Sequence, residues 1–95
     1  MSELHSRKAE QQILGYCMIN GAEGLIYAQS LGLGGLDFYY SHHRACWLWF
    51  CQRIEAGQSL EMTLIVTEAA HSGRAEDLGG LAYLSDLPED APLLL

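Results

Sequence analysis

The chain has 95 residues, of which 49% are hydrophobic, and a formal net charge of −7. That length allows one small domain, and the hydrophobic content argues against intrinsic disorder. A nucleic-acid-binding surface needs clustered cations that displace counterions from phosphates, and the scarcity of Lys and Arg argues against one. The longest apolar run is far shorter than the about 18 residues of a membrane-spanning helix, and the polar stretch 1–10 is unlike a signal peptide, so we expect one cytoplasmic domain over residues 1–95 with no membrane contact.

The first two predicted helices span ranges 6–19 and 22–31. In both ranges, apolar residues recur at steps of three and four residues, which places them on one helical face. Ser6 can cap the first helix, and Gly21 separates the two. The glycine-rich range 32–35 ends the second helix. A phosphate-binding loop would have a strand before these glycines and usually a lysine after them, and this chain has neither.

The third predicted helix, 41–56, is apolar around most of its circumference, as expected of a helix that is buried or meets a partner. Trp47 and Trp49 are two residues apart, so their side chains point about 200° from each other on a helix. Either both pack in the core, or one of them contacts a partner. The candidate partner-binding residues are those that extend the apolar surface beyond the core stripe: Leu48, Trp49 and Cys51.

Two more helices are predicted, over ranges 63–71 and 80–87. The range 64–67 is β-prone by itself, but its acidic and alanine-rich flanks favour a helix. The leucines of the last range lie one turn apart, and Pro88 ends it. Because no hairpin pattern and no internal repeat occurs, the sequence predicts an all-α fold, a small bundle of about five short helices.

Residues that carry chemistry do not form a convincing set. An odd number of cysteines without a Cys-x-x-Cys spacing predicts free thiols in the core. His42 and Cys46 share a helix face, but zinc needs three or four converging ligands. A nucleophilic pair of Cys46 or Cys51 with His71 would need an exposed, electropositive thiol, and these thiols lie among aromatic residues in an acidic chain. We therefore expect no catalytic residue, metal or cofactor, and rank a small metal- or thiol-dependent protein last.

Several short phrases occur in a particular order along the chain. Ala-Glu-Gln at 9–11 is followed by Leu14-Gly15, and a helix that starts near a His-Arg pair ends at Gly57. The motif residues after the first helix are Asp37, Phe38, Tyr39, His43, Arg44, Gly79, Gly80, Ala82, Tyr83 and Leu84. In this order and spacing, over about residues 9–87, the phrases resemble the N-terminal domain of DnaB-type replicative DNA helicases.

The resemblance implies a helical head that performs no reaction. In this family an ATPase domain follows and unwinds DNA, while the head and the helical hairpin after it help to assemble the ring and bind primase. We therefore expect self-association with helicase subunits, contact with primase or another replisome protein, and no direct binding of nucleic acid. The sequence ends where the hairpin would begin, so we expect it to lack hairpin and motor. The alternative is a free-standing phage- or plasmid-type adaptor or decoy that copies this head.

Departures from the family pattern suggest a divergent member. Glu61 replaces the usual capping Asp and is a poorer helix cap. Arg53 stands where the family has an aliphatic core residue, so either the helix is rotated or Arg53 extends its charged end to solvent. Leu48 and Cys51 replace residues that are usually polar and exposed, which is why they belong to the candidate patch.

Overall fold

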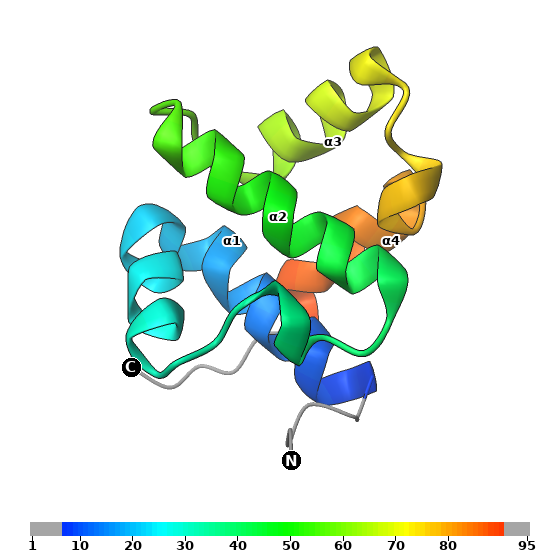
Figure 1. The fold of residues 1–95 in the computed structure, drawn as a ribbon. Coiled ribbons are helices and arrows are strands. Elements are labelled where there is room, and N and C mark those ends of the chain that lie inside the picture. Colours follow the sequence, from blue (N-terminus) through cyan, green and yellow to red (C-terminus); the bar gives the residue numbers. More distant parts are fainter. Residues whose placement is uncertain (1–6, 91–95) are drawn as a thin grey trace.

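The computed structural model describes residues 7–90, and within that range the chain forms four α-helices and three short 3-10 helices without a strand (Figure 1). The Cα radius of gyration is 12.0 Å, and the principal extents are 36 × 24 × 22 Å. The predicted all-α class is therefore confirmed. The structure has four α-helices where about five were expected, because the first two predicted helices are the two limbs of one bent helix.

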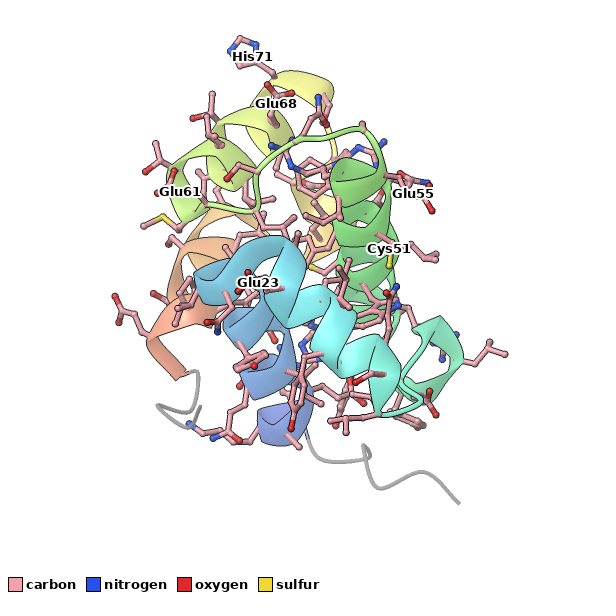
Figure 2. The ribbon with its side chains drawn as sticks, turned by 90° about the vertical axis from the view of Figure 1, so that its left-hand side faces the viewer. Glu23, Cys51, Glu55, Glu61, Glu68 and His71 are labelled. Atoms are coloured by element: carbon pink, nitrogen blue, oxygen red, sulfur yellow. The ribbon has the colours of Figure 1, made fainter. Side chains whose placement is uncertain are left out.

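That bent helix is α1, Arg7–Ser30, and its kink is at Gly21. Gly21 has φ 64° and ψ −140°, a conformation that residues with a Cβ rarely adopt. The second limb turns away from the first, with Glu23 just beyond the bend (Figure 2). The backbone therefore leaves the helical conformation at Gly21, which separates two helical limbs as the sequence predicted. Ser6, the predicted cap, lies outside the described residues.

The helix α2, Ser41–Glu55, follows the 3-10 helix η1, Gly35–Asp37. Its bounds agree with the predicted third helix to within one residue. The capping residue is Tyr40, whose side chain makes no capping hydrogen bond, and Ser41 is the first helical residue. Ser41, whose residue type is common at helix caps, is therefore one position inside the helix.

The range that was ambiguous between helix and strand forms α3, Met62–Ser72. The Glu61 carboxylate accepts a hydrogen bond from the Leu64 amide at 3.4 Å, so this residue does cap the helix. Three further elements complete the described chain in sequence order: the 3-10 helix η2, Glu76–Leu78, the helix α4, Leu81–Asp86, and the 3-10 helix η3, Leu87–Asp90.

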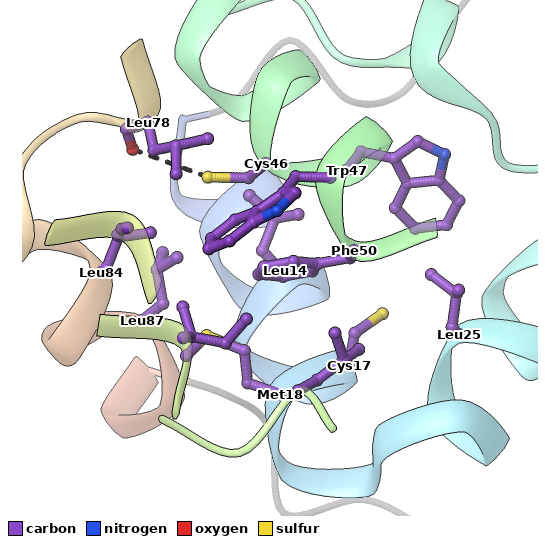
Figure 3. Packing of buried hydrophobic residues seen from close by; sticks show 14 of the residues in the cluster. Leu14, Cys17, Met18, Leu25, Cys46, Trp47, Phe50, Leu78, Leu84 and Leu87 are labelled. Atoms are coloured by element: carbon purple, nitrogen blue, oxygen red, sulfur yellow. Dashed lines mark hydrogen bonds between the residues drawn. The ribbon is translucent and has the colours of Figure 1, made fainter. Parts of the chain in front are cut away.

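The hydrophobic core lies between α1, α2 and the C-terminal elements, with α1 in direct contact with both α2 and η3 (Figure 1). Phe50 of α2 meets Leu14 of α1, and leucines from α4 and η3 close the opposite side (Figure 3). The largest fully buried apolar side chains are Leu14, Phe38, Phe50, Leu60, Ile65, Leu78, Leu84 and Leu87. These residues come from every part of the described chain, so α1 and the C-terminal elements are held in one unit.

Both tryptophans of α2 are buried, although their side chains leave the helix in different directions. Trp47 is 2% exposed and packs against Phe38 with its ring tilted, the ring centroids lying 5.3 Å apart. Trp49 is 7% exposed because two guanidinium groups cover its ring, those of Arg53 and Arg74, each 5.4 Å from the ring centroid. Trp49 is therefore covered by neighbouring side chains, and its predicted contact with a partner protein stays a prediction.

Arg53 has a structural role within α2 and the loop that follows. It is 5% exposed, and its Nε donates a hydrogen bond to the Ser59 carbonyl at 2.8 Å. The guanidinium group therefore ties the α2–α3 loop to the helix. Of the two expectations for Arg53, extension into solvent is contradicted by this burial.

Candidate protein-interaction site

The motif residues identified in the sequence converge on a buried carboxylate, that of Glu10 in the first limb of α1. Glu10 is 0% exposed and accepts three hydrogen bonds. The backbone amides of Tyr39 and Tyr40 donate at 2.7 and 3.4 Å, and the Nδ1 of His43 lies at 2.7 Å. A buried charge is tolerable only when it is paired and hydrogen-bonded in this way. Glu10 therefore fixes the loop before α2, and the start of α2, against α1.

The network continues from His43 to α4. Because a carboxylate only accepts, Nδ1 of His43 carries the proton and its Nε2 accepts from the Tyr83 hydroxyl. The same hydroxyl accepts from Nε2 of Gln11 at 2.8 Å. The Arg7 guanidinium lies over the Tyr83 ring, 5.3 Å from its centroid. Sequence motifs that are far apart along the chain thus contact one another in a single hydrogen-bond network.

Electrostatically, the network favours a neutral imidazole. Burial lowers the pKa of His43 below its ordinary value of 6.5, against the opposing effect of the hydrogen bond to Glu10. Burial, followed by the neighbouring His43, also lowers the pKa of His42. Burial raises the pKa of Tyr83, so its hydroxyl keeps its proton near neutral pH. Every proton that the network needs is therefore in place near neutral pH.

The Asp-Phe-Tyr phrase is held by local contacts as well. The Asp37 carboxylate accepts from the Gly34 amide at 2.8 Å and closes η1. Arg44, in the first turn of α2, donates from Nε to the Phe38 carbonyl at 2.7 Å and from Nη2 to the Tyr39 carbonyl at 2.9 Å. The two polar motif residues therefore bracket Phe38, which is 1% exposed and packs in the core.

Gly79 explains the Gly-Gly phrase before α4. Its φ is 105°, and a Cβ there would lie 2.7 Å from Cδ2 of Tyr83 and 3.1 Å from Cδ2 of His42. Gly80 also has a positive φ, 101°, but nothing lies within 4 Å of its Cβ position. Glycine is therefore needed at the first position for both conformation and space, which lets Tyr83 approach His43. In the same phrase, Ala82 is exposed and Leu84 is fully buried.

The network contains a residue that the list of motif residues missed. Glu10 precedes Leu14 by four positions and Cys17 by seven, so it lies on the same helical face as these buried residues. A carboxylate on an apolar face is a sign of a buried, paired acid, and this spacing was visible in the sequence. All of its partners lie inside the domain, so its role in the structure is to hold the elements together.

The predicted partner-binding residues do not form one exposed patch. Leu48 is 57% exposed, whereas Trp49 is buried. Cys51 is half-buried, and its sulfur lies 3.7 Å from the amide nitrogen of Gln29 on α1. Only Leu48 of the three is therefore available as an apolar contact for another protein.

A second exposed leucine lies on η1, the element next to α2. Leu36 is 97% exposed. It follows Gly35, whose backbone packs against Leu48, because a Cβ on Gly35 would lie 3.7 Å from Cδ2 of Leu48. We call Leu36 and Leu48 the leucine patch. A leucine with almost all of its side chain in water contributes nothing to the core, and such residues in a group are typical of binding surfaces.

The thiols and histidines do not assemble a reactive centre within residues 7–90. Burial raises the pKa values of Cys17 and Cys46 to about 12, so these thiols stay protonated. His71 lies near the end of α3, well away from Cys51 on α2 (Figure 2). No group of three or more His, Cys, Asp or Glu in the described range could hold a metal ion. Nor does any helix there have the length and apolar character to span a membrane.

These features define a small helical domain with a buried hydrogen-bond network around Glu10 and His43 and with exposed leucines on η1 and α2. The comparison with known proteins identifies which such domain it is. The chain belongs to the family of the DnaB-like helicase N-terminal domain, whose sequence profile matches residues 2–94. The resemblance carried by the sequence motifs is thereby confirmed.

Two curated relatives show the same similarity. The chain is 30% identical over 99 residues to the replicative DNA helicase DnaB of Geobacillus stearothermophilus, covering 97% of this chain and 21% of that protein. It is 28% identical over 88 residues to the replicative DNA helicase DnaB of Pasteurella multocida (strain Pm70), covering 93% and 18%. The chain therefore spans about a fifth of the length of these relatives.

Proposed function

We propose that this chain is a non-catalytic protein-interaction domain of a replicative DNA helicase, acting in the cytoplasm. It contributes to assembly of the helicase ring and to contact with primase or another replisome protein. The family match supports the placement in a replicative helicase. The observation that supports a binding role is the leucine patch, because Leu36 is 97% exposed, more than any other large apolar residue in the described part of the chain.

The charge of the chain supports protein partners over DNA. With a formal net charge of −7 and only five Lys and Arg residues, the domain repels phosphate groups. Two of those residues, Arg53 and Arg74, already face the Trp49 ring. Unwinding of DNA is therefore assigned to another part of the helicase.

The test is a double variant, Leu36→Ser with Leu48→Ser, and its matched control is Leu64→Ser, which changes an exposed leucine on α3. Binding of the chain to immobilised primase from the same source is measured by biolayer interferometry. We expect the double variant to weaken binding tenfold or more, since a buried leucine anchor contributes about 1.5–3 kcal/mol. Equal binding by the double variant and the control would refute the leucine patch as the contact surface.

A further inference from the structure

The connection from α3 to η2 holds one arginine, Arg74, in a fixed position. Gly73 ends α3 in the left-handed conformation, with φ 74°. The amide of Arg74 donates to the Ala69 carbonyl at 3.1 Å, and its carbonyl accepts from the Leu78 amide at 3.2 Å. The next element, η2, packs against α2 (Figure 1). The backbone of Arg74 is therefore bonded on both sides, next to α2.

The side chain of Arg74 lies over an aromatic ring of α2. Its guanidinium is 5.4 Å from the centroid of the Trp49 indole. The residue is nevertheless exposed, and within residues 7–90 its side chain has no hydrogen bond and no ion pair. The ring attracts the cation but offers no oxygen atom to its N–H donors. These donors are therefore available to a ligand.

A second cation against the same ring makes the surroundings of Arg74 positive. The guanidinium of Arg53 also lies 5.4 Å from the Trp49 centroid. Arg53 is 5% exposed and bonded to the Ser59 carbonyl, so it is not accessible to a ligand. Neither guanidinium has a carboxylate within salt-bridge distance in the described chain. Two like charges at one ring repel each other, and a carboxylate from outside would offset that repulsion.

The other cations of the described chain interact with groups inside the domain. Arg44 donates two hydrogen bonds to backbone carbonyls. Arg7 lies over two tyrosine rings of the network that holds the Glu10 carboxylate. Lys8 is not free either. Arg74 is thus an exposed cation whose side chain has one charge-related contact in residues 7–90, and that contact is with an uncharged ring.

We propose that Arg74 binds the carboxylate of an acidic side chain in a partner protein. The planar guanidinium can engage both oxygens of a carboxylate through paired hydrogen bonds while it stays over Trp49. Because the ring already restricts the side chain, less conformational freedom is lost on binding. Arginine and tryptophan are also enriched among the residues that dominate protein interfaces.

This contact would give Trp49 an indirect part in partner binding, as the residue that positions Arg74. A single guanidinium suits one carboxylate, whereas a nucleic-acid backbone needs several cations along its phosphates. The inference rests on the proposed protein-binding function, and it adds a second contact and the chemistry of the partner segment that meets it.

The experiment titrates the ¹⁵N-labelled chain at constant ionic strength with the capped peptide Gly-Ala-Glu-Ala-Gly. The NMR signals followed are the Nε–H of Arg74 and the indole N–H of Trp49, and the control peptide has glutamine in place of glutamate. We expect a dissociation constant on the order of 10 mM, as for one paired charge-assisted contact, and no measurable binding of the glutamine peptide.

Three results of this titration would overturn the proposal. The first is equal binding of the two peptides, and the second is no shift at several times the expected dissociation constant. The third is a shift of the Nε–H signals of Arg7 and Arg44 as large as that of Arg74, which would indicate unspecific attraction. The indole signal of Trp49 should shift together with that of Arg74, because the guanidinium stays over the ring when it binds.

Variants separate the planar group from its charge. Arg74→Gln should abolish binding, and Arg74→Lys, which keeps the charge but cannot pair with both oxygens, should weaken it about two- to fivefold. Lys8→Gln removes the same charge from α1 and should leave binding unchanged. A loss as large as that of Arg74→Gln would mean that the peptide senses only the net charge, and the proposal fails. Retained binding by Arg74→Gln, with its helical circular dichroism intact, also refutes it.

The result is separable from the proposed function. The peptide titration needs no helicase or primase, and the variant Leu36→Ser with Leu48→Ser should bind the glutamate peptide as the parent chain does. Loss of primase binding in that variant with peptide binding intact supports both proposals. Failure of the leucine patch test would leave the titration of Arg74 unaffected.

Discussion

The Nδ1 atom of His43 lies 2.7 Å from Oε1 of Glu10, and neither side chain is exposed to solvent. This contact joins α1 to α2, and through Tyr83 it also reaches α4. Removing one member of such a buried pair leaves the polar group of the other member buried without a hydrogen-bond partner. The resulting loss of folding free energy is larger than the stabilisation that the intact pair contributes. The stability of the domain should therefore depend strongly on either residue.

Glu10→Gln tests this dependence. The amide keeps one acceptor oxygen but adds two donors, so at least one of the three donors that now reach Glu10 must face another donor. We expect the free energy of unfolding, from urea denaturation at pH 7.5, to fall by about 2–4 kcal/mol. The control Glu68→Gln, at an exposed site, should stay within about 0.5 kcal/mol of the parent chain. A Glu10 variant as stable as this control would contradict the role given to the network.

The same network should make stability depend on pH. The folded pKa of His43 lies below 6.5, and that of His42 is also lowered, so the unfolded chain binds more protons than the folded chain as the pH falls. The stability from neutral His43 is complete above the unfolded pKa and is lost as the pH falls from about 6.5 towards the folded pKa. Glu10, Arg7, Tyr40 and Tyr83 are the titratable or charged groups that face this histidine from the neighbouring elements.

Urea denaturation at pH 7.5, 6.5 and 5.5 measures that dependence. We expect a steady decrease in the free energy of unfolding for the parent chain. His42→Gln removes one of the two contributions and should reduce the slope without abolishing it. A free energy of unfolding that rises as the pH falls over this range would show that His43 gains a proton on folding, contrary to the burial seen here.

The paired glycines before α4 give a matched comparison. Gly79→Ala combines a positive φ with a Cβ that would lie 2.7 Å from the Tyr83 ring, whereas Gly80→Ala has only the positive φ. The backbone conformation alone costs about 1–2 kcal/mol. We expect Gly80→Ala to lose about that amount and Gly79→Ala to lose about 1–3 kcal/mol more, since overpacking adds to the strain. Equal losses in thermal or urea unfolding would mean that the ring moves aside freely.

Helix positions were largely predictable because they depend on local patterns. The apolar helical pattern placed α2 to within one residue, and the helix-forming flanks placed α3 to within one residue at each end. The break at Gly21 was also predicted: its backbone is not helical and separates the two limbs of α1. The local pattern gave no indication of the angle between the limbs, which depends on how they pack in the folded domain.

The site was less predictable, for a related reason. Trp49 looked exposed because its face of α2 diverges from that of Trp47, but the side chain that helps to cover it belongs to Arg74, in the connection after α3. The spacing of residues within one helix contains no information about which side chains from other segments of the chain will bury them. The motif phrases did name most of the network around His43, yet they gave no indication of the exposure of Leu36, which depends on how η1 lies on α2.

Direct DNA binding should be absent. The described chain carries no basic cluster, and the net charge of −7 opposes the approach of phosphates. In fluorescence anisotropy with a labelled single-stranded oligonucleotide at moderate salt, we expect no binding by the parent chain. Tight binding that weakens steeply with added salt would overturn this expectation, since that dependence is the signature of counterion release.

Self-association of the chain should be weak and should increase with salt. Its net charge makes two copies repel each other, while the leucine patch offers only two exposed leucines as apolar contact. Raising the salt concentration shortens the Debye length from about 30 Å at 0.01 M to about 8 Å at 0.15 M, which screens the repulsion and leaves the apolar contact intact. Sedimentation velocity should therefore show a monomer at low salt and a larger dimer fraction at high salt. Leu36→Ser should remove that increase, whereas Leu64→Ser should not; a stable hexamer at low salt would contradict the prediction.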